Sequence, residues 1–388
     1  MKISMLGTRG VPAQYGGFET AVEEIGARLV ERGHDITVYC RNTQQELRTY
    51  RGMNLRNLPA IRLRSAETLS HTALSMIQVL QDRPDVALVF NMANSPLLPA
   101  LSVSGIPAAL HVDGMEWQRG KWEGLGRRYY KAAERFGVKF ADALIADSGG
   151  IADYYRQRYR VSARKIAYGT EIRTLEVKGE LPIAGVFARQ YHLIVARWVP
   201  ENNLDVLMSG YSKSSAQHPL LIVGDAAYDS PYAQQLRAIA DQDHRIRLLG
   251  AIYDQDLLNT LYSGALSYLH GHSVGGTNPS LLRAMGSGVP VTAFDVVFNR
   301  EVLGDTGTYF RHQQQVTRQV EMYESDVADG RARAVAAQER ARSRYDWALV
   351  ASQYESLCED LMGLKRRGLI DYAQGFRVRR GSGRFARH

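Results

Sequence analysis

Residues 2–40, KISMLGTRGVPAQYGGFETAVEEIGARLVERGHDITVYC, decide the fold. They begin with a short apolar run, 2–7, that ends in glycine, and a loop with paired glycines follows. Over 18–34, apolar residues recur at helical spacing up to Gly33, which ends the predicted helix. A second apolar run, 35–40, completes a strand–loop–helix–strand unit. Such a unit is typical of the start of a doubly wound α/β domain.

The same pattern continues along the chain. Further strands are expected at 85–90, 107–112, 141–147 and 165–169, and after a looser stretch at 172–190 strands are expected at 191–197, 219–225, 245–250, 265–271 and 289–295. The sequence thus predicts two doubly wound Rossmann-like α/β domains, 1–188 and 189–345, a closing helix at 346–364 and a basic tail at 365–388. Ligands of such sheets bind at the carboxyl ends of the strands, so a substrate cleft is expected between the domains.

Composition excludes several classes of protein. The 388 residues are enough for two or three domains. Apolar residues make up 45% and charged residues 23%, as in globular proteins, and no apolar window of about 18 residues could span a membrane. The first ten residues lack the apolar core of a signal peptide. Two isolated cysteines, Cys40 and Cys358, suit neither a disulfide framework nor a zinc site. We expect a cytoplasmic protein without a metal site.

Positive charge gathers at the end of the chain. The formal net charge is +8, and residues 363–388 hold eight Lys/Arg against one acid, so the rest is nearly neutral. This distribution argues against a nucleic-acid-binding body. It favours peripheral contact between the tail and an anionic membrane, at the inner face of the plasma membrane. A solvated tail without a partner is the alternative.

Two loops at predicted strand ends have residues that suit a phosphate group. Gly16 and Gly17 lie between the first strand and the first helix, where a flexible backbone and free N–H groups can approach a ligand. Arg197 ends the strand at 191–197 and is a natural partner for diphosphate oxygens. A tight turn and a surface ion pair are the respective alternatives. Neither half of the chain has the G-x-G-x-x-G spacing of a dinucleotide site.

The stretch 275–285, GGTNPSLLRAM, has the same features in a stronger form. Gly275 and Gly276 permit unusual backbone angles, and Pro279 suits a first helical turn, where its missing N–H costs nothing. The amides of 280–282 are then expected to be unpaired and directed at the loop. A diphosphate there would gain hydrogen bonds and the favourable end of the helix dipole.

Three segments together resemble the family 4 glycosyltransferases, which have the GT-B fold: GTRGVPAQYGGFET at 7–20, ENN at 201–203 and HGHSVGGTNPSLL at 270–282. The resemblance covers residues 1–360 and is closest to a subgroup associated with rhamnosyltransferases of bacterial surface polysaccharide assembly. It implies retaining transfer of a sugar, rhamnose among the candidates, from a dTDP-, UDP- or GDP-linked donor to a saccharide or lipid-linked saccharide. It implies no cofactor and no obligatory metal.

The resemblance also implies roles for individual residues. The Gly16–Gly17 loop would face the donor phosphates and the acceptor, and His111 would lie near the transferred sugar. Arg197 would neutralise the departing diphosphate. Taken without the resemblance, a histidine at a strand end is more often structural. The nucleotide sugar would be held by residues of the second domain: Asn202, Gly224, Asp225, Gly276, Thr277, Asn278, Ser280, Leu281 and Arg283.

The chain departs from the family pattern at two places. Many members have a lysine a few residues after the arginine, where this chain has ENN at 201–203. The usual motif has two glutamates eight positions apart, and here those positions are Gly275 and Arg283. The second glutamate accepts hydrogen bonds from the ribose, which an arginine cannot do. Arg283 therefore reaches the diphosphate in place of the lysine, marks weakened donor binding, or fits a different nucleotide.

Three functions stay open. The first is an active sugar-nucleotide-dependent transferase. The second is a catalytically weakened binding or scaffold protein, for which Arg283 is the support. The third is a GT-B enzyme of another reaction type, such as a sugar-nucleotide epimerase, which the YGGFET and GGTNPSLL segments disfavour.

The acceptor is expected in the N-terminal half. Residues 111–142 mix Trp, Tyr, Lys and Arg, which suits a membrane interface, and an ordinary packed helix is the alternative. Asp113 and Glu116 are candidate bases that deprotonate the acceptor. The DQD motifs at 241–243 and 254–256 are expected to cap helices rather than to bind metal.

Overall fold

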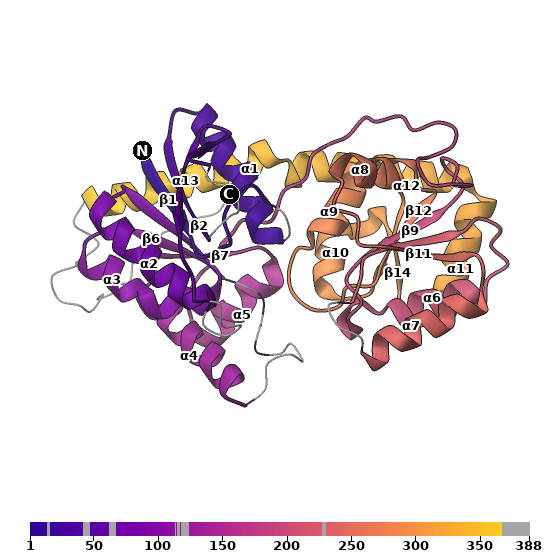
Figure 1. The fold of residues 1–388 in the computed structure, drawn as a ribbon, viewed down its shortest axis with the longest axis horizontal. Coiled ribbons are helices and arrows are strands. Elements are labelled where there is room, and N and C mark those ends of the chain that lie inside the picture. The colour runs from indigo at the N-terminus through magenta and orange to yellow at the C-terminus, as the bar shows by residue number, and fades with distance from the viewer. Residues whose placement is uncertain are drawn as a thin grey trace. The chain divides into compact units, whose positions relative to one another are not determined.

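The computed structural model describes residues 1–13, 16–41, 47–61, 67–112, 114, 117, 124–226 and 230–366. The chain divides into two compact units, each built on one sheet with helices on both faces (Figure 1). The first unit holds residues 1–147, 151–166 and the chain from Ala351 onward, and the second holds 148–150 and 167–350. The predicted fold class, two doubly wound α/β domains, is confirmed.

The sheet of the first unit has the order β3-β4-β2-β1-β5-β6-β7-β8. Its strands are β1 (Lys2–Leu6), β2 (Asp35–Arg41), β3 (Thr49–Tyr50), β4 (Met53–Leu58), β5 (Val86–Phe90), β6 (Ala108–Val112), β7 (Ala143–Ala146) and β8 (Arg164–Lys165). All neighbours pair in parallel except β3 and β4, and Ile3 of β1 lies in register with Ile36 and Val86. Every residue of β5 and β6 is buried, as expected for parallel strands that are covered on both faces.

Helices cover both faces of this sheet. They are α1 (Gly17–Glu31), α2 (Glu67–Asp82), η1 (Met92–Leu97), α3 (Leu98–Val103), α4 (Gly124–Phe140), α5 (Gly149–Tyr159) and α13 (Trp347–Arg366). One face packs on α2, α3, α4 and α5 through a core that includes Met76, Leu101, Ala133 and Ile151. On the other face lie α1 and α13 (Figure 1). Glu355 of α13 accepts a hydrogen bond of 2.7 Å from Arg32, just after α1.

The sheet of the second unit is parallel throughout and has the order β11-β10-β9-β12-β13-β14. Its strands are β9 (His192–Val195), β10 (Leu220–Val223), β11 (Ile246–Gly250), β12 (Ser267–His270), β13 (Val291–Phe294) and β14 (Thr308–Phe310). Its helices are η3 (Pro200–Asn202), α6 (Leu204–Ser212), α7 (Pro231–Gln242), α8 (Gln255–Gly264), α9 (Pro279–Gly286), α10 (Val297–Leu303), η4 (Gly304–Thr306), α11 (Gln313–Ser325) and α12 (Val327–Tyr345). In Figure 1 the sheet lies between α6, α7 and α11 on one side and α8, α9 and α12 on the other.

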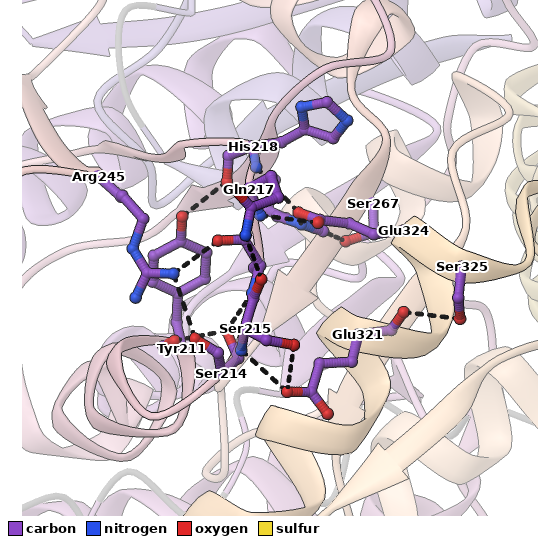
Figure 2. Close-up of polar contacts among 12 residues, drawn as sticks. Tyr211, Ser214, Ser215, Gln217, His218, Arg245, Ser267, Glu321, Glu324 and Ser325 are labelled. Carbon is purple, nitrogen blue, oxygen red and sulfur yellow. Dashed lines mark hydrogen bonds and ion pairs between the residues drawn. The ribbon is translucent and has the colours of Figure 1, made fainter.

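A polar network ties α11 to the turn before β10. Glu324 accepts hydrogen bonds from the amides of Gln217 at 2.7 Å and His218 at 3.0 Å, and it lies 3.1 Å from the ring of His192. The nearby Glu321 accepts two from Ser215 (Figure 2). Burial raises the pKa of Glu324, but the hydrogen bonds from His192 and the two amides outweigh it and lower the pKa to about 2. The network therefore holds an ionised carboxylate at the amino ends of the strands.

Most predicted strands run a few residues past the observed ones, and two of these differences affect the later argument. The strand expected at 165–169 is wrong beyond Lys165, because the chain leaves the sheet there and Thr170 N donates instead to Tyr345 O at 2.7 Å. The strand expected at 191–197 ends at Val195, so Arg197 lies in the following loop. Among the described residues, no helix is long and apolar enough to cross a membrane.

Candidate functional site

The loop after β9 presents Arg197. The side chain of Asn202 bonds within the loop, since its Nδ2 donates to Arg197 O at 2.7 Å. Trp198 N donates to Asp225 O at 3.1 Å, which ties the loop to the end of β10. The side chain of Arg197 is exposed, and within the described ranges no hydrogen bond or ion pair engages its guanidinium. The backbone of this loop is fixed while its cation stays available to a ligand.

The loop after β12 is joined to the loop after β9. The ring Nδ1 of His272 lies 2.7 Å from Oδ1 of Asn202, and the amide of Ser273 donates to Glu201 O at 2.9 Å. Asn203, in the left-handed region at φ 47°, donates from Nδ2 to Gly271 O at 2.7 Å. Sequence reasoning named Asn202 but missed this pairing, because residues 70 positions apart give no local signal. Two segments that are distant in sequence thus form one wall.

Helix α9 begins at the end of this wall, and its first turn is partly occupied. Asn278 is the N-cap, and its Oδ1 accepts from Ser280 N at 3.0 Å and from Ser280 Oγ at 2.8 Å. Leu282 N donates to Asn278 O at 3.1 Å. The expectation that the amides of 280–282 are all unpaired is therefore wrong for Ser280 and Leu282. The side chain of Asn278 accepts a backbone hydrogen bond that a bound anion was expected to accept.

Glycines bring the loops of the wall together. Gly224 has φ 135°, and a Cβ added there would lie 1.9 Å from Ala196 O. Only glycine therefore lets the loops after β9 and β10 approach so closely. Asp225, next to it, accepts from the amide of Ala226 at 2.7 Å. Gly275 also has a positive φ, of 121°, while Gly276 lies half-buried beside the buried Thr277.

Arg283 is committed to α8. Its Nε donates to Asn259 Oδ1 at 3.1 Å and its Nη1 to Gln255 Oε1 at 3.0 Å, and Nη2 contacts both of these residues. The guanidinium also lies 5.4 Å from the ring centre of Tyr262. Burial lowers the pKa of this guanidinium. The structure adds a fourth interpretation to the three above and favours it: Arg283 ties α9 to α8, since the observed bonds use all three guanidinium nitrogens. Leu281, between the cap and Arg283, is fully buried in the core.

In the first unit, His111 lies in an aromatic pocket. It is 2% exposed at the end of β6, its ring stacks on Phe90 at 5.7 Å between centroids, and Phe18 of α1 meets it edge-on at 5.0 Å. Burial lowers the pKa of His111 to about 4, so the imidazole is neutral at pH 7. A neutral ring can exchange hydrogen bonds with a sugar but cannot neutralise a phosphate.

The glycine loop before α1 is held by carboxylates of that helix. Glu19 accepts from Arg9 N at 3.0 Å and Glu23 from Ala13 N at 2.7 Å. Gly16 is the N-cap of α1 with φ 124°, and a Cβ there would collide with the Glu19 carboxylate. Gly17 opens the helix. The loop is thus fixed close to the helix N-terminus, where an anion is favoured.

The predicted acceptor bases and the two DQD motifs do not lie among the residues of the wall described above. Asp113 and Glu116 lie outside the described residues. Asp254 caps α8 by accepting from the amides of Asp256 and Leu257, and Asp243 pairs with Arg245 at 2.7 Å, so both DQD motifs have the structural roles expected. In the part of the chain that the structure describes, no group of three His, Cys, Asp or Glu side chains could hold a metal ion.

Residues 189–323 match the family described as Glycosyl transferases group 1. The second unit carries a glycosyltransferase domain. Residues 1–171 match a family described as Domain of unknown function (DUF1972). Among curated proteins, none matches the sequence of this chain.

Solved structures share the fold of most of the chain. Sucrose-phosphate synthase from Thermosynechococcus elongatus is 17% identical with a TM-score of 0.78, over 93% of this chain and 99% of that chain. HepE of Anabaena, in complex with UDP, is 17% identical with a TM-score of 0.72, over 93% and 100%. The lipopolysaccharide outer core galactosyltransferase WaaB is 16% identical with a TM-score of 0.62, over 93% and 99%. The fold is GT-B.

The GT-B fold and the domain match confirm the predicted enzyme class, a glycosyltransferase. The finer expectation, membership of the rhamnosyltransferase-like subgroup, stays a prediction. In the GT-B arrangement, the wall built from the loops after β9, β10 and β12 lies at the carboxyl ends of the strands, where such sheets bind their ligands.

Proposed function

We propose that the protein is a retaining glycosyltransferase that moves a sugar from a nucleotide-diphosphate sugar to a saccharide or lipid-linked saccharide acceptor, with rhamnose as the first sugar to test. The main support for the proposal is the wall of the second unit, which is formed by the loops after β9, β10 and β12. Asn202 and His272 join two strand-end loops, and Arg197, whose carbonyl is bonded to Asn202, offers a guanidinium with no acidic partner among the described residues. A fixed wall with one uncommitted cation suits a diphosphate.

The chemistry asked of this wall is stabilisation of negative charge. When the bond from the sugar to the diphosphate breaks, charge develops on the leaving phosphate oxygens. A positioned cation and backbone dipoles lower the barrier because they are already oriented before the reaction. In the proposal Arg197 supplies the cation, Gly224 and Gly275 let the backbone approach the ligand, and Asn278 holds the first turn of α9 in place.

The donor nucleotide is proposed by analogy. HepE of Anabaena was solved with UDP, with UDP and glucose, and with UDP-glucose. UDP-sugars therefore head the panel of candidate donors, and GDP- and dTDP-sugars complete it. No carboxylate at the position of Arg283 accepts hydrogen bonds from a ribose, so the panel includes donors with ribose and with deoxyribose.

The acceptor is proposed to lie at a membrane surface. On α4 the exposed side chains are cationic or apolar, and the acid of this helix, Glu134, is buried. Leu125 is 81% exposed and Phe136 is 40% exposed. The exposed cations of α4 are Arg127, Arg128, Lys131, Arg135 and Lys139. Such a face suits an anionic lipid surface at the cytoplasmic side, and the basic tail that we expected to assist it lies largely outside the described residues.

A scaffold protein without turnover is the second candidate. Arg283 supports it, because its guanidinium bonds to Asn259 and Gln255 and so occupies a position where the family pattern has a ligand-binding acid.

Calorimetry with UDP-, GDP- and dTDP-sugars, followed by an assay for free nucleoside diphosphate, separates the two candidates. We expect one donor to bind and to be hydrolysed, and Arg197→Ala to weaken binding by about tenfold or more, as the loss of a charge-assisted contact should. The matched control is Arg318→Ala, an exposed arginine on α11. Binding without turnover would favour the scaffold, and equal effects of the two variants would remove Arg197 from the site.

A further inference from the structure

The second unit contains a cavity of about 660 Å³ at the amino ends of its strands. Leu266 and Pro290 line it directly before β12 and β13, and Arg189 lines it shortly before β9. Tyr323 of α11 and the first turns of α12 complete the lining. The wall that is proposed to hold the donor lies at the carboxyl ends of the same strands. A cavity of this volume accommodates a small organic molecule, so the unit has room for a second ligand.

Two arginines bring positive charge to this cavity. Arg189 is in the left-handed region at φ 63°, where its backbone N donates to Gly264 O at 2.7 Å and its Nη1 donates to Ala265 O at 3.0 Å. Arg331 is exposed on α12. Among the described residues, no carboxylate bonds to either arginine. Both guanidiniums therefore keep donors that are available to a ligand.

The charges that line the cavity do not balance. Lys178 lies 3.0 Å from Glu176, and together these two neighbours are neutral. Two arginines remain. Burial lowers the pKa of Arg189, and the charge of Arg331 lowers it further. Like charges that the fold brings together without an acid repel each other, and a bound anion would turn this repulsion into attraction.

Apolar side chains lie beside the two cations. Val327 and Val335 of α12 are 42% and 68% exposed, and they lie four residues before and after Arg331. Residues spaced by four are neighbours on one face of a helix, so α12 presents an arginine between two valines to the cavity. Leu266 and Ala334 are buried at the same cavity. A ligand that matches this lining has an anionic group and an apolar group.

We propose that this cavity is a second binding site, which takes a small organic phosphate. Arg189 and Arg331 bond the phosphate oxygens, and the valines of α12 cover the apolar part of the ligand. A phosphate monoester carries close to two negative charges at neutral pH, which matches two guanidiniums better than a carboxylate does. The site is separate from the proposed transfer reaction, because it lies at the opposite ends of the strands from the donor wall.

Phenyl phosphate is the probe for this site, and its binding to the full chain is measured by an NMR titration of the ligand signals. The probe combines a phosphate with an apolar ring. Inorganic phosphate and phenol each lack one of these parts and should bind about tenfold more weakly. Benzoate, with one negative charge, should also bind more weakly. Phenol that binds as tightly as phenyl phosphate, or phenyl phosphate that does not saturate, would overturn the proposal.

Replacing each arginine tests its role. Arg331→Gln should weaken the binding of phenyl phosphate about tenfold, as the loss of a charge-assisted contact should. Arg189→Gln should do the same, and thermal unfolding is measured beside it because this variant also loses the bond to Ala265. Arg318→Gln, on the exposed side of α11, is the matched control and should bind as the native chain does. Equal affinities of Arg331→Gln and Arg318→Gln would contradict the proposal.

Val335→Glu supplies the acid that the cavity lacks. A carboxylate four residues after Arg331 on the same helix pairs with it and competes with the probe. This variant should lose the binding of phenyl phosphate, whereas the uncharged Val335→Gln should keep at least the affinity that the native chain has for inorganic phosphate. Native affinity in Val335→Glu would show that the probe binds elsewhere.

The donor wall is excluded by a separate variant. Arg197→Ala removes the cation of that wall and should leave the affinity for phenyl phosphate unchanged. A loss in Arg197→Ala together with native affinity in Arg331→Gln would assign the probe to the donor wall and overturn the proposal. Because the readout is binding of the probe, it decides this inference whether or not the chain hydrolyses a donor sugar.

Discussion

The ring Nδ1 of His272 lies 2.7 Å from Oδ1 of Asn202, and this contact is one of those that join the loop after β12 to the loop after β9. Asn202 is 6% exposed, and its Nδ2 bonds to the carbonyl of Arg197. A single amide side chain thus fixes both the neighbouring loop and the residue that presents the cation. The ENN segment, which lacks the lysine of the family pattern, contributes order to the site instead of charge.

Replacing this amide should harm both the fold and the donor site. Asn202→Ala removes two buried hydrogen bonds, so we expect the free energy of unfolding to fall by about 1–3 kcal/mol in urea titrations. Donor affinity should fall as well, since the backbone that presents Arg197 is no longer held in place. Asn57→Ala, which removes an exposed amide bonded to Leu47 O in the first unit, is the control and should leave both quantities nearly unchanged. An Asn202→Ala protein with native donor affinity would show that the two loops need no tie.

Arg283 should contribute to the stability of the fold rather than to donor binding. Arg283→Met keeps the bulk of the side chain but leaves Asn259 and Gln255 without their donor, so we expect the free energy of unfolding to fall by about 1–3 kcal/mol. Arg318→Met on the surface should change it by less than about 0.5 kcal/mol. If Arg283→Met is as stable as the native chain but loses donor binding, Arg283 belongs to the ligand site and the observed bonds to α8 are broken when the donor binds.

Gly224 should tolerate no side chain. Gly224→Ala combines an unfavourable φ of 135° with a Cβ at 1.9 Å from Ala196 O. Gly250→Ala is a matched control at the end of the neighbouring strand, with φ 70° and no atom within 4 Å of the added Cβ. In the control, the free energy of unfolding should fall by only about 1–2 kcal/mol, which is the cost of a side chain at positive φ. In Gly224→Ala it should fall by clearly more, as measured by thermal or urea unfolding. Equal losses would mean that the backbone angle alone, and not the close approach of the two loops, requires glycine at 224.

Acid should weaken the network of Figure 2. The pKa of Glu324 in the folded chain, about 2, is below its ordinary value of 4.5. The carboxylate therefore stabilises the fold fully above pH 4.5, and this contribution is lost as the pH falls from there to about 2. The difference in unfolding free energy between the native chain and Glu324→Gln should be constant at neutral pH and shrink over that interval. Glu359→Gln, at an exposed site on α13, should show no such trend. A difference in unfolding free energy that is as large at pH 2.5 as at neutral pH would mean that the pKa of Glu324 is not lowered.

The fold was predictable because its signals are local. The strands at 2–7 and 35–40 are recognised from short apolar runs, and the helix between them from apolar residues at helical spacing that end at a glycine. Each of these patterns lies within a short stretch of sequence. The strand expected at 165–169 failed beyond Lys165 because Ile166 and Tyr168 are buried although they lie past the end of β8, so their burial imitated the apolar pattern of a strand. The missed strands are β3, a two-residue edge strand, and β4, in which the alternation of buried and exposed residues covers only residues 53–56.

The site was predictable in its parts but not in its connections. Glycine loops, Arg197 and Asn278 follow from strand ends and helix starts. The pairing of Asn202 with His272, the capture of Arg283 by Asn259, and the meeting of Arg189 and Arg331 at one cavity join residues that only the folded chain brings together. Whether an arginine faces a ligand or a neighbouring helix is settled by packing, on which sequence spacing has no bearing.

The most direct test of the central claim is the release of nucleoside diphosphate from a panel of UDP-, GDP- and dTDP-sugars, measured on the native chain and on Arg197→Ala with Arg318→Ala as control. The account predicts that the native chain and the control hydrolyse one donor slowly, and that Arg197→Ala loses about tenfold or more in kcat/KM, since it lacks the cation for the leaving diphosphate. Turnover that is unchanged in Arg197→Ala, or no release from any donor by the native chain, would contradict it.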